Sequence, residues 1–377
     1  MHVLILSTNV ANPYVTNEGI FFADQAKALS KHGHKVGYVS VHPVPFLLVL
    51  KKGTRDLGKK DYRLEGVNYL VDSYIKWPKN HLQPMTAALK RGKRLMQTYI
   101  EKFGKPDIVH LHTFDAGLLA IWIKETYNVA YVVTEHSSRF LANTIPNEKV
   151  MSVARTTFEN SNLNISVSDS FKVAMEQQMK VQFTVIPNIV DTKLFTLDSF
   201  TDKKRKIISI GRFDDNKNQL LVIEALREVR KRIKNIELII IGKGTNEAVL
   251  KNKVQELGLN ENVVFEGFIS RGRIAEIAKT TSLLAITSYH ETFGVVAIEA
   301  MSAGNLVITT PCGGPEKIIS TFGKVSSFDK LEFAKDICEL LNDFDEDQMN
   351  ASRKYAIENF SEEAIVSKLE NVYDSII

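Results

Sequence analysis

LLAITSYHETFGVVAIEA, residues 283–300, runs from an apolar segment of strand length through a polar loop into an apolar segment of helix length. This order predicts a buried strand, a ligand-facing loop and a buried helix. Glu291 lies in the polar loop, and Glu299 lies eight residues later in the segment of helix length. On one continuous helix they would lie about 12 Å apart along the axis, too far to share one proton or one metal ion. Their spacing favours two separate duties on one extended ligand.

Short apolar runs of this kind recur along the chain, separated by segments of helix length. The first series comprises residues 3–7, 35–39, 108–111, 131–134, 163–167 and 184–186. The second series comprises residues 206–210, 236–241, 263–265, 283–287 and 306–309. Alternation of strands and helices predicts parallel sheets with helices on both faces. The predicted fold class is α/β, with two doubly wound sheets in tandem.

The helices of the second series are expected over residues 218–231, 246–257, 273–279 and 295–303. Residues 191–204 are polar and lack a sheet period, so we place the linker there. A chain of 377 residues exceeds a comfortable single core, which also favours two domains.

The chain has two cysteines, Cys312 and Cys338, and neither lies in a metal-ligand spacing. A reducing cytoplasm is the simplest compartment for such a chain. Residues 1–7 are interpreted as a first core strand and not as a signal peptide. No apolar run reaches the length needed to span a bilayer.

The formal charge of +4 hides an asymmetry, because residues 44–105 hold fourteen Lys and Arg against five Asp and Glu. Residues 46–52 and 89–95 combine apolar with basic side chains, which suits the surface of an anionic membrane. The alternative is a solvated basic face without a partner. Nucleic acid is not expected, since no recognised binding module accompanies the charge.

Gly211-Arg212-Phe213-Asp214-Asp215-Asn216-Lys217 follows the first strand of the second series. Two cations on a loop at a strand end suit a diphosphate, Arg212 through its planar fork and Lys217 as a point charge. The alternative is an exposed basic pair that the two aspartates partly neutralise.

Gly242-Lys243-Gly244-Thr245-Asn246-Glu247 resembles the start of a dinucleotide fingerprint. Its third glycine position holds Glu247, which would obstruct helix packing and repel a pyrophosphate. Nicotinamide or flavin binding is therefore not expected, and the glycines are assigned to a tight turn.

Gly294 would allow the backbone to approach a ligand at the start of the helix that carries Glu299. Amides and the helix dipole at such a point favour phosphate oxygens or sugar hydroxyls. Glu299 suits the vicinal hydroxyls of a ribose, and the alternative for it is an interhelical salt bridge. The loop with Gly313-Gly314-Pro315-Glu316 follows another strand.

These segments, in this order, resemble glycosyltransferase family 4, whose members have the GT-B architecture of two Rossmann-like domains facing a central cleft. The match extends over nearly the whole chain. It is carried by Gly19, Gly33-His34-Lys35-Val36, residues 107–112, Thr134-Glu135-His136, residues 186–191, Gly211-Arg212, Lys217, residues 291–299, Gly304, Gly313-Gly314, Glu316 and residues 359–363. The resemblance implies domains over residues 1–195 and 196–358, with residues 359–377 forming a helix that crosses back to the first domain.

The resemblance also assigns roles to individual residues. Arg212 and Lys217 would hold the diphosphate of a nucleotide sugar, and Glu291 would lie near the transferred hexose. Glu299 would bind the ribose. Donor contacts are further expected from Gly19, Gly211, Ile269, Thr292, Phe293, Gly294 and Val295. His136 would reach the sugar from the acceptor side, although a lone histidine is more often structural.

The implied enzyme is a retaining hexosyltransferase that uses a UDP- or GDP-sugar and needs no metal or other cofactor. The acceptor would be a glycan or a lipid-linked molecule in surface polysaccharide synthesis, at the cytoplasmic face of a membrane. Two alternatives stay open, a nucleotide-sugar epimerase of the same fold and a non-catalytic nucleotide-sugar binding protein.

Overall fold

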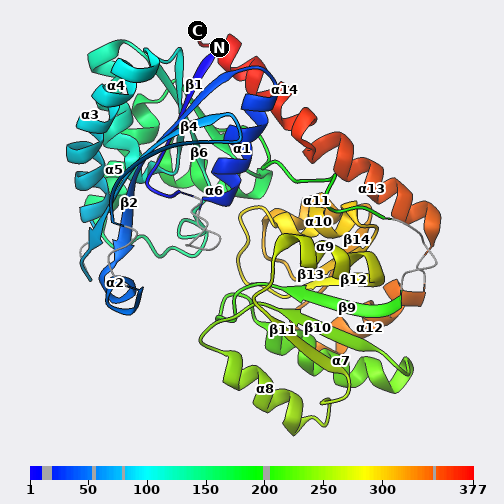
Figure 1. Ribbon diagram of the computed structural model, residues 1–377. Helices are drawn as coiled ribbons and strands as arrows, with labels where there is room; N and C mark the ends of the chain where they lie inside the picture. Colours follow the sequence, from blue (N-terminus) through cyan, green and yellow to red (C-terminus); the bar gives the residue numbers. More distant parts are fainter. Residues whose placement is uncertain (11–18, 53–56, 79–80, 198–203, 343–344) are drawn as a thin grey trace. The chain divides into compact units, whose positions relative to one another are not determined.

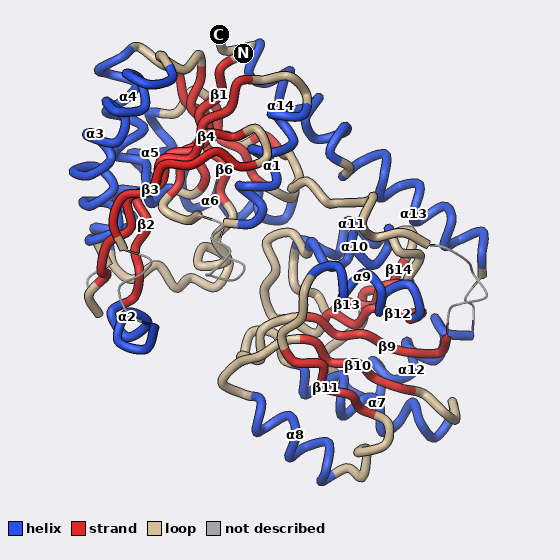
Figure 2. The backbone as a smooth tube through the Cα atoms, viewed as in Figure 1, coloured by secondary structure: helices blue, strands red, loops and turns tan. Residues whose placement is uncertain are grey.

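A computed structural model describes residues 1–10, 19–52, 57–78, 81–197, 204–342 and 345–377. Within them the chain forms two compact units, Met1–Ile189 with Ile365–Ile377, and Val190–Ala364. Each unit holds one sheet between layers of helices (Figures 1 and 2). The predicted α/β fold with two doubly wound sheets is confirmed. The domain boundaries placed after residues 195 and 358 stay predictions.

The sheet of the first unit is parallel except at one edge. Its order is β3 (Gly58–Leu64), β4 (Val67–Lys76), β2 (Lys35–Pro45), β1 (His2–Ser7), β5 (Ile108–His112), β6 (Ala130–Glu135), β7 (Leu163–Ser166) and β8 (Thr184–Val185). The chain winds outward from β1 in one direction and from β5 in the other. The neighbours β1 and β5 therefore form the switch point of this sheet, where ligands collect in folds of this kind.

Strands β3 and β4 form an antiparallel hairpin that the sequence analysis did not predict. Leu64 pairs with Val67, so Glu65 and Gly66 alone make the turn, and both have positive φ, 50° and 84°. Positive φ at both positions defines the tight turn that matches the twist of a hairpin. The prediction failed because these residues were interpreted through their basic charge, and Glu-Gly is a weaker turn signal than Asn-Gly.

Two helical layers cover the first sheet (Figure 1). One layer contains α3 (Gln83–Phe103), α4 (Gly117–Tyr127) and α5 (Glu148–Asn160). The other contains α1 (Ile20–Lys31) and the C-terminal helix α14 (Glu362–Asp374). Helix α6 (Asp169–Met179) contacts α5. Ile365, Val366, Leu369 and Tyr373 of α14 belong to the core of this unit. The prediction that the last helix crosses back to the first domain is thus confirmed.

The sheet of the second unit is parallel throughout its described strands. Its order is β11 (Val263–Gly267), β10 (Glu237–Ile241), β9 (Lys204–Ile210), β12 (Thr281–Ile286), β13 (Leu306–Thr309) and β14 (Gly323–Val325). The short edge strand β14 was not predicted, because three residues carry too little apolar signal. The switch point lies between β9 and β12, which are neighbours in the sheet.

Helices α7 (Gln219–Arg232), α8 (Glu247–Glu256) and α12 (Lys330–Asn342) contribute to a large apolar core with this second sheet. The remaining helices are α9 (Arg271–Thr280), α10 (Val295–Ser302), α11 (Gly314–Ile319) and α13 (Glu346–Phe360). Helices α7 to α10 coincide with the four predicted ones to within two residues at each end. No helix in the described segments is long and apolar enough to cross a membrane.

Candidate active site

The loops that follow β9 and β12 meet at the switch point of the second sheet. Asn216 joins them, because its backbone oxygen accepts from the Tyr289 amide at 2.8 Å. Its side chain donates to the His290 oxygen at 3.0 Å and accepts from the His290 amide at 3.1 Å. Thr287 Oγ1 donates to the Lys217 carbonyl at 2.8 Å. Backbone groups therefore hold the two loops in one register. The sequence analysis did not single out Asn216, since an asparagine in a polar loop carries no specific signal.

Lys217 and Glu291 form an ion pair at this place, with 2.5 Å between Nζ and Oε1. Ser288 Oγ donates to the same carboxylate oxygen at 2.6 Å. The side chains of Lys217 and Glu291 are 25% and 15% exposed, so the pair is accessible without being freely solvated. The two residues, 74 positions apart in the sequence, were predicted to serve different parts of one ligand. Their direct contact and the role of Ser288 were not predicted.

Arg212 lies on the same loop as Lys217 but is held differently. Its guanidinium is 84% exposed, and Nη2 is 2.8 Å from the Asp214 carboxylate. Asp214 also accepts from the Lys217 amide at 3.1 Å, which tightens the turn between the two cations. The alternative interpretation, in which an aspartate partly neutralises the cation, therefore holds for Arg212. Lys217 instead pairs with Glu291.

Glycines make room for this loop. A Cβ at Gly211 would stand 3.2 Å from the side chain of Lys217. A Cβ at Gly242 would stand 1.8 Å from the Gly211 oxygen, and one at Gly244 would stand 2.2 Å from the Phe213 oxygen. The fingerprint-like segment after β10 thus serves close backbone packing beside the loop with Arg212 and Lys217. This packing is a more specific duty than the tight turn assigned to it.

The segment from Glu291 to Val295 lies against the loop after β13. The Glu291 amide donates to the Cys312 oxygen at 2.7 Å, and the Gly314 amide donates to the Glu291 oxygen at 2.8 Å. Gly294 has φ 84° directly before α10, and a Cβ there would stand 2.5 Å from Pro315. Glycine is therefore needed at this position for both conformation and space.

The remaining predicted residues of this segment differ in accessibility. Phe293 is 3% exposed and its ring meets the ring of Phe360, so its side chain is part of the core. Thr292 precedes it in the loop, and Val295 is the first residue of α10. The burial of this ring leaves the backbone groups of Phe293 for a ligand, and its donor contact stays a prediction.

Glu299 on α10 forms an ion pair with Arg271 on α9. Its Oε1 accepts from Arg271 Nη2 at 2.8 Å and from Nε at 3.2 Å. The Glu299 side chain is 8% exposed, and the Arg271 side chain 28%. The interhelical salt bridge named as the alternative is therefore present, and the ribose contact stays a prediction. Arg271 was not predicted, because a basic first turn of a helix is an ordinary feature.

Ile269 lies after β11, which is separated from β9 by β10. The next residue, Ser270, is the N-cap of α9, because its Oγ accepts from the Arg273 amide at 3.2 Å. Ile269 itself is half-buried, and its contact with the base of a nucleotide stays a prediction.

A cluster of aromatic rings lies at the carboxyl edge of the first sheet, beside the buried Glu135 and an ion pair of Arg139 with Asp115. His112 at the end of β5 and His136 after β6 approach within 3.0 Å, from Nδ1 to Nε2. The ring of His112 stacks with the rings of Phe22 and His110, with 4.5 Å between ring centroids in both pairs. Gly19, with φ 76°, directly precedes the helix that carries Phe22. Residues 11–18, which precede Gly19, lie outside the described residues.

These histidines are neutral at ordinary pH. Burial lowers the pKa of His110 to about 3 and that of His136 to about 3, and it also lowers the pKa of His112. His110 Nδ1 lies 2.6 Å from the Tyr373 hydroxyl and 2.9 Å from the Gln25 amide nitrogen. Because both groups can donate, Nδ1 accepts and Nε2 donates to Thr134 Oγ1 at 2.7 Å. A helix from the far end of the chain thus fixes one ring of the cluster.

Glu135, beside His136, is completely buried. Its carboxylate accepts from the amides of Phe114, His136 and Ser137 at 3.1, 2.9 and 2.8 Å. Burial nevertheless raises the pKa of Glu135 to about 7. Its bonds to backbone amides show a structural duty, namely holding the loop that carries His136.

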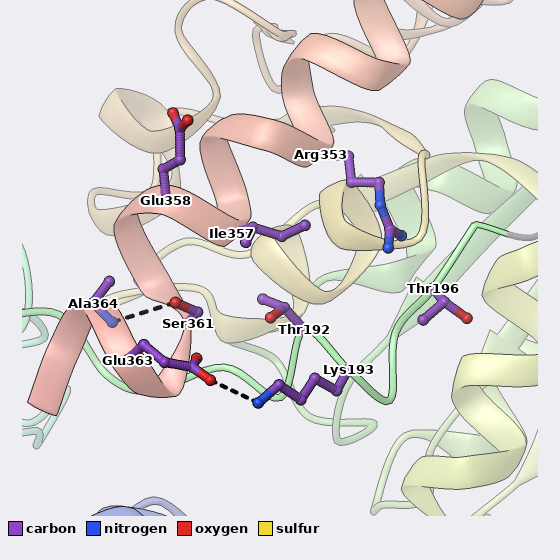
Figure 3. A pocket seen from close by; sticks show the side chains of 9 residues that line it. All are labelled: Thr192, Lys193, Thr196, Arg353, Ile357, Glu358, Ser361, Glu363 and Ala364. Carbon is purple, nitrogen blue, oxygen red and sulfur yellow. Dashed lines mark hydrogen bonds and ion pairs between the residues drawn. The ribbon is translucent and has the colours of Figure 1, made fainter. Parts of the chain in front are cut away.

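A groove in the second unit involves none of the predicted site residues (Figure 3). It lies between residues 192–196 and the junction of α13 with α14, where Lys193 pairs with Glu363 at 2.6 Å. Lys193 and Arg353 are balanced by Glu358 and Glu363, so the groove has no excess charge for a diphosphate.

Comparison with known proteins agrees with the fold of the two units. Residues 19–194 match the model of Glycosyltransferase Family 4, and residues 195–360 match that of Glycosyl transferases group 1. The chain belongs to glycosyltransferase family 4, and its fold is that of the GT-B glycosyltransferases.

Two curated relatives and one solved structure illustrate the similarity. An uncharacterized glycosyltransferase of Methanocaldococcus jannaschii is 25% identical, over 92% of this chain and 91% of the relative. GDP-mannose:cellobiosyl-diphosphopolyprenol alpha-mannosyltransferase of Xanthomonas oryzae is 26% identical, over 67% and 70%. The structure of Anabaena HepE in complex with UDP has a TM-score of 0.72 at 19% identity, over 100% of both chains.

Proposed function

We propose that this glycosyltransferase moves a hexose, with retention of configuration, from a UDP- or GDP-sugar to a hydroxyl of a glycan or lipid-linked acceptor. The observation that supports this most directly is the pair of Lys217 and Glu291 at the switch point of the second sheet. A cation and a carboxylate held 2.5 Å apart suit the junction of a diphosphate with a sugar. The cation would neutralise phosphate oxygens, and the carboxylate would accept from sugar hydroxyls.

The chemical step follows from these roles. The bond between the anomeric carbon and the terminal phosphate oxygen breaks, and the acceptor oxygen forms the new bond on the same face of the sugar. The acceptor proton passes to the leaving phosphate oxygen, which takes up the electron pair of the broken bond. Lys217 and the exposed Arg212 stabilise the charge that develops on the diphosphate. No protein side chain has to act as a general acid, and no metal is required in this scheme.

His136 would contact the sugar from the first domain. Its ring is neutral because burial holds its pKa near 3, so it can orient a hydroxyl without adding charge. Glu299 would hold the ribose, and Arg271 would keep its carboxylate in place.

The acceptor proposal rests on charge and on similarity. Residues 44–105 carry a local excess of nine positive charges, which suits a chain that works at an anionic membrane surface. A relative that acts on a cellobiosyl-diphosphopolyprenol supports a lipid-linked acceptor, as in surface polysaccharide synthesis. The similarity to HepE in complex with UDP supports a nucleotide sugar as donor.

A donor panel tests this function. The chain is incubated with UDP- and GDP-sugars, and release of the nucleoside diphosphate is measured together with the sugar product. We expect release with one donor, faster when an acceptor is present, and an unchanged rate after chelation of divalent metals. Isomerisation of the sugar without release would support the epimerase alternative. Donor binding without either reaction would support a non-catalytic binding protein.

The stereochemical part of the proposal has its own measurement. The anomeric configuration of the new bond is determined by proton NMR of the product. Inversion of configuration would contradict front-face attack while leaving the transferase assignment intact.

A further inference from the structure

An arm projects from the carboxyl edge of the first sheet. Strand β2 pairs with β1 only as far as Ser40, whereas its remaining residues, to Pro45, pair with β4 alone. The short helix α2 (Phe46–Lys52) follows directly at the end of this extension (Figure 1). The arm therefore extends past the edge at which His112 and His136 lie, on the β2–β4 side of the sheet.

The tip of the arm exposes large apolar side chains. Leu47 and Leu50 on α2 are 64% and 66% exposed, and Trp77 just beyond β4 is 53% exposed. Phe46 stacks on Trp77 with 4.8 Å between ring centroids, which ties α2 to the end of β4. Neighbouring exposed leucines and a tryptophan are typical of an interaction surface, and tryptophan is favoured at the boundary between a bilayer and water.

A groove of about 640 Å³ lies beside this tip, between the end of the arm and the first turns of α3. Its lining comprises Leu57, Gly58, Ser73, Tyr74, Ile75, Trp77, Gln83, Thr86, Ala87, Lys90 and Arg91. Among these described residues two are cationic and none is acidic. The groove thus combines hydrogen-bond donors, an exposed aromatic ring and two cationic side chains, of which Arg91 is paired with Asp72.

The two cations of the groove are available in different ways. Arg91 is fixed by Asp72, because its Nη1 donates to both carboxylate oxygens at 3.0 and 3.1 Å, and it lies over the ring of Tyr74. This leaves its Nε and Nη2 hydrogens for a ligand. Lys90 is exposed and has no ion-pair partner in the described part of the chain. A planar donor and a point charge on one helix suit phosphate oxygens.

We propose that this groove binds the phosphate of a lipid headgroup while Leu47, Leu50 and Trp77 insert into the interfacial region of the bilayer. The proposal rests on the proposed transferase function and deepens it, because it names the surface that would receive a membrane-bound acceptor. Apolar side chains beside cations are the combination by which peripheral proteins bind anionic membranes.

Other occupants fit less well. A soluble phosphate would use Lys90 and Arg91 but would leave the exposed leucines without a function. A second copy of the chain, related by twofold symmetry, would bring two basic surfaces against each other, which like charges disfavour. The bilayer satisfies both the apolar tip and the positive groove.

Vesicle co-sedimentation of the full chain tests the proposal. The probes are phosphatidylcholine vesicles, the same vesicles with phosphatidylglycerol, and the same with a polyprenyl phosphate at equal negative charge. We expect no binding to phosphatidylcholine, binding to both anionic mixtures that weakens with salt, and tighter binding to the polyprenyl phosphate, whose terminal phosphate can enter the groove.

Two variants separate the two parts of the surface. Leu47→Glu with Leu50→Glu should abolish binding to every vesicle. Lys90→Ala should weaken binding to polyprenyl phosphate vesicles about fivefold, since each basic side chain near an anionic surface contributes on that order. The matched controls Val173→Glu and Lys149→Ala, on exposed positions of α6 and α5, should bind as the unaltered chain does.

Three results would overturn the proposal. They are equal binding to neutral and anionic vesicles or to neither, unchanged binding of the Lys90 or leucine variants, and full competition by inorganic phosphate, which would indicate a soluble ligand. A change from dimer to monomer in the leucine variant would indicate a second copy instead. Donor turnover is measured separately, so failure of the transferase function and failure of membrane binding give different results.

Discussion

The carboxyl edges of the two sheets differ in the side chains that they bring together. In the second unit a charged pair, Lys217 and Glu291, remains partly accessible and is held by hydrogen bonds between loops. In the first unit the corresponding edge holds stacked rings, and burial keeps the rings of His110 and His136 neutral. The difference supports the proposal that the second sheet binds the charged diphosphate and that the first sheet orients uncharged hydroxyls. Two sheets of similar topology thus present different side chains at their carboxyl edges.

Replacing Lys217 should have the largest effect on turnover. Lys217→Ala should lower kcat by about 10²–10³-fold, because it removes charge that stabilises the leaving diphosphate. The measurement is nucleoside diphosphate release under saturating donor. Lys206→Ala is the matched control, since Lys206 has a similar exposure, 26%, and pairs with Glu237 at 2.7 Å in the same sheet. Equal loss of turnover in both variants would remove Lys217 from the site.

The buried histidines predict that the stability of the first unit falls in acid. The histidines with lowered pKa take up protons on unfolding below about pH 6.5, so their contribution to stability is lost as pH falls. Glu135 acts in the opposite direction, because its raised pKa makes its contribution disappear as pH rises towards about 7. With three histidines against one glutamate, the free energy of unfolding should fall by about 2–3 kcal/mol per pH unit between about pH 6 and pH 5.

Denaturant titrations at several pH values measure this dependence. His112→Asn removes one of the titrating rings and should make the dependence shallower. Stability that stays flat over this interval would show that the rings are charged or solvated, and the contrast between the two edges would then fail.

Glu299 distinguishes ligand binding from a structural ion pair. Glu299→Gln should raise KM for the donor about tenfold, because a hydrogen bond to a charged group contributes about 1.5–3 kcal/mol. Arg271→Ala should lower the thermal midpoint and change KM less, since the carboxylate remains. If both variants lose stability and neither changes KM, Glu299 is only the partner of Arg271.

The smallest effect is expected at Ser288. Its hydroxyl orients the Glu291 carboxylate at 2.6 Å, so Ser288→Ala should lower kcat about fivefold, in line with about 1 kcal/mol for one hydrogen bond. Ser327→Ala, which removes a hydroxyl that bonds Glu332 outside the site, serves as the control. An unchanged kcat would mean that the position of Glu291 is set by Lys217 and the backbone alone.

The alternation of apolar runs was enough to predict two mainly parallel sheets, because buried strands and their helices have strong periodic signals. It failed for β3, β4 and β14. In the first two, charge dominated the interpretation, and β14 is too short to carry a pattern. The hairpin turn at Glu65 and Gly66 became recognisable only from its two positive φ angles.

The predicted site residues divide in the same way. Lys217, Glu291 and Gly294 could be selected from their places after predicted strands and before a predicted helix. Their supporting residues Asn216, Ser288 and Arg271 could not, since polar residues in loops and at helix starts are common. Asn216 and Arg271 contact residues that are distant in the sequence, and Ser288 is one of several polar residues near Glu291.

The sequence by itself determined the class of fold, most of the strands and helices in their order along the chain, and the loops that carry charge, because these depend on local periodicity and composition. Only the tertiary structure decided that Lys217 meets Glu291, that Glu299 meets Arg271 and that three histidines stack into a neutral cluster. It also decided that an apolar tip stands beside a positive groove. The physical reason is that such contacts depend on which strands become neighbours, and strand neighbours are selected by burial of the whole core.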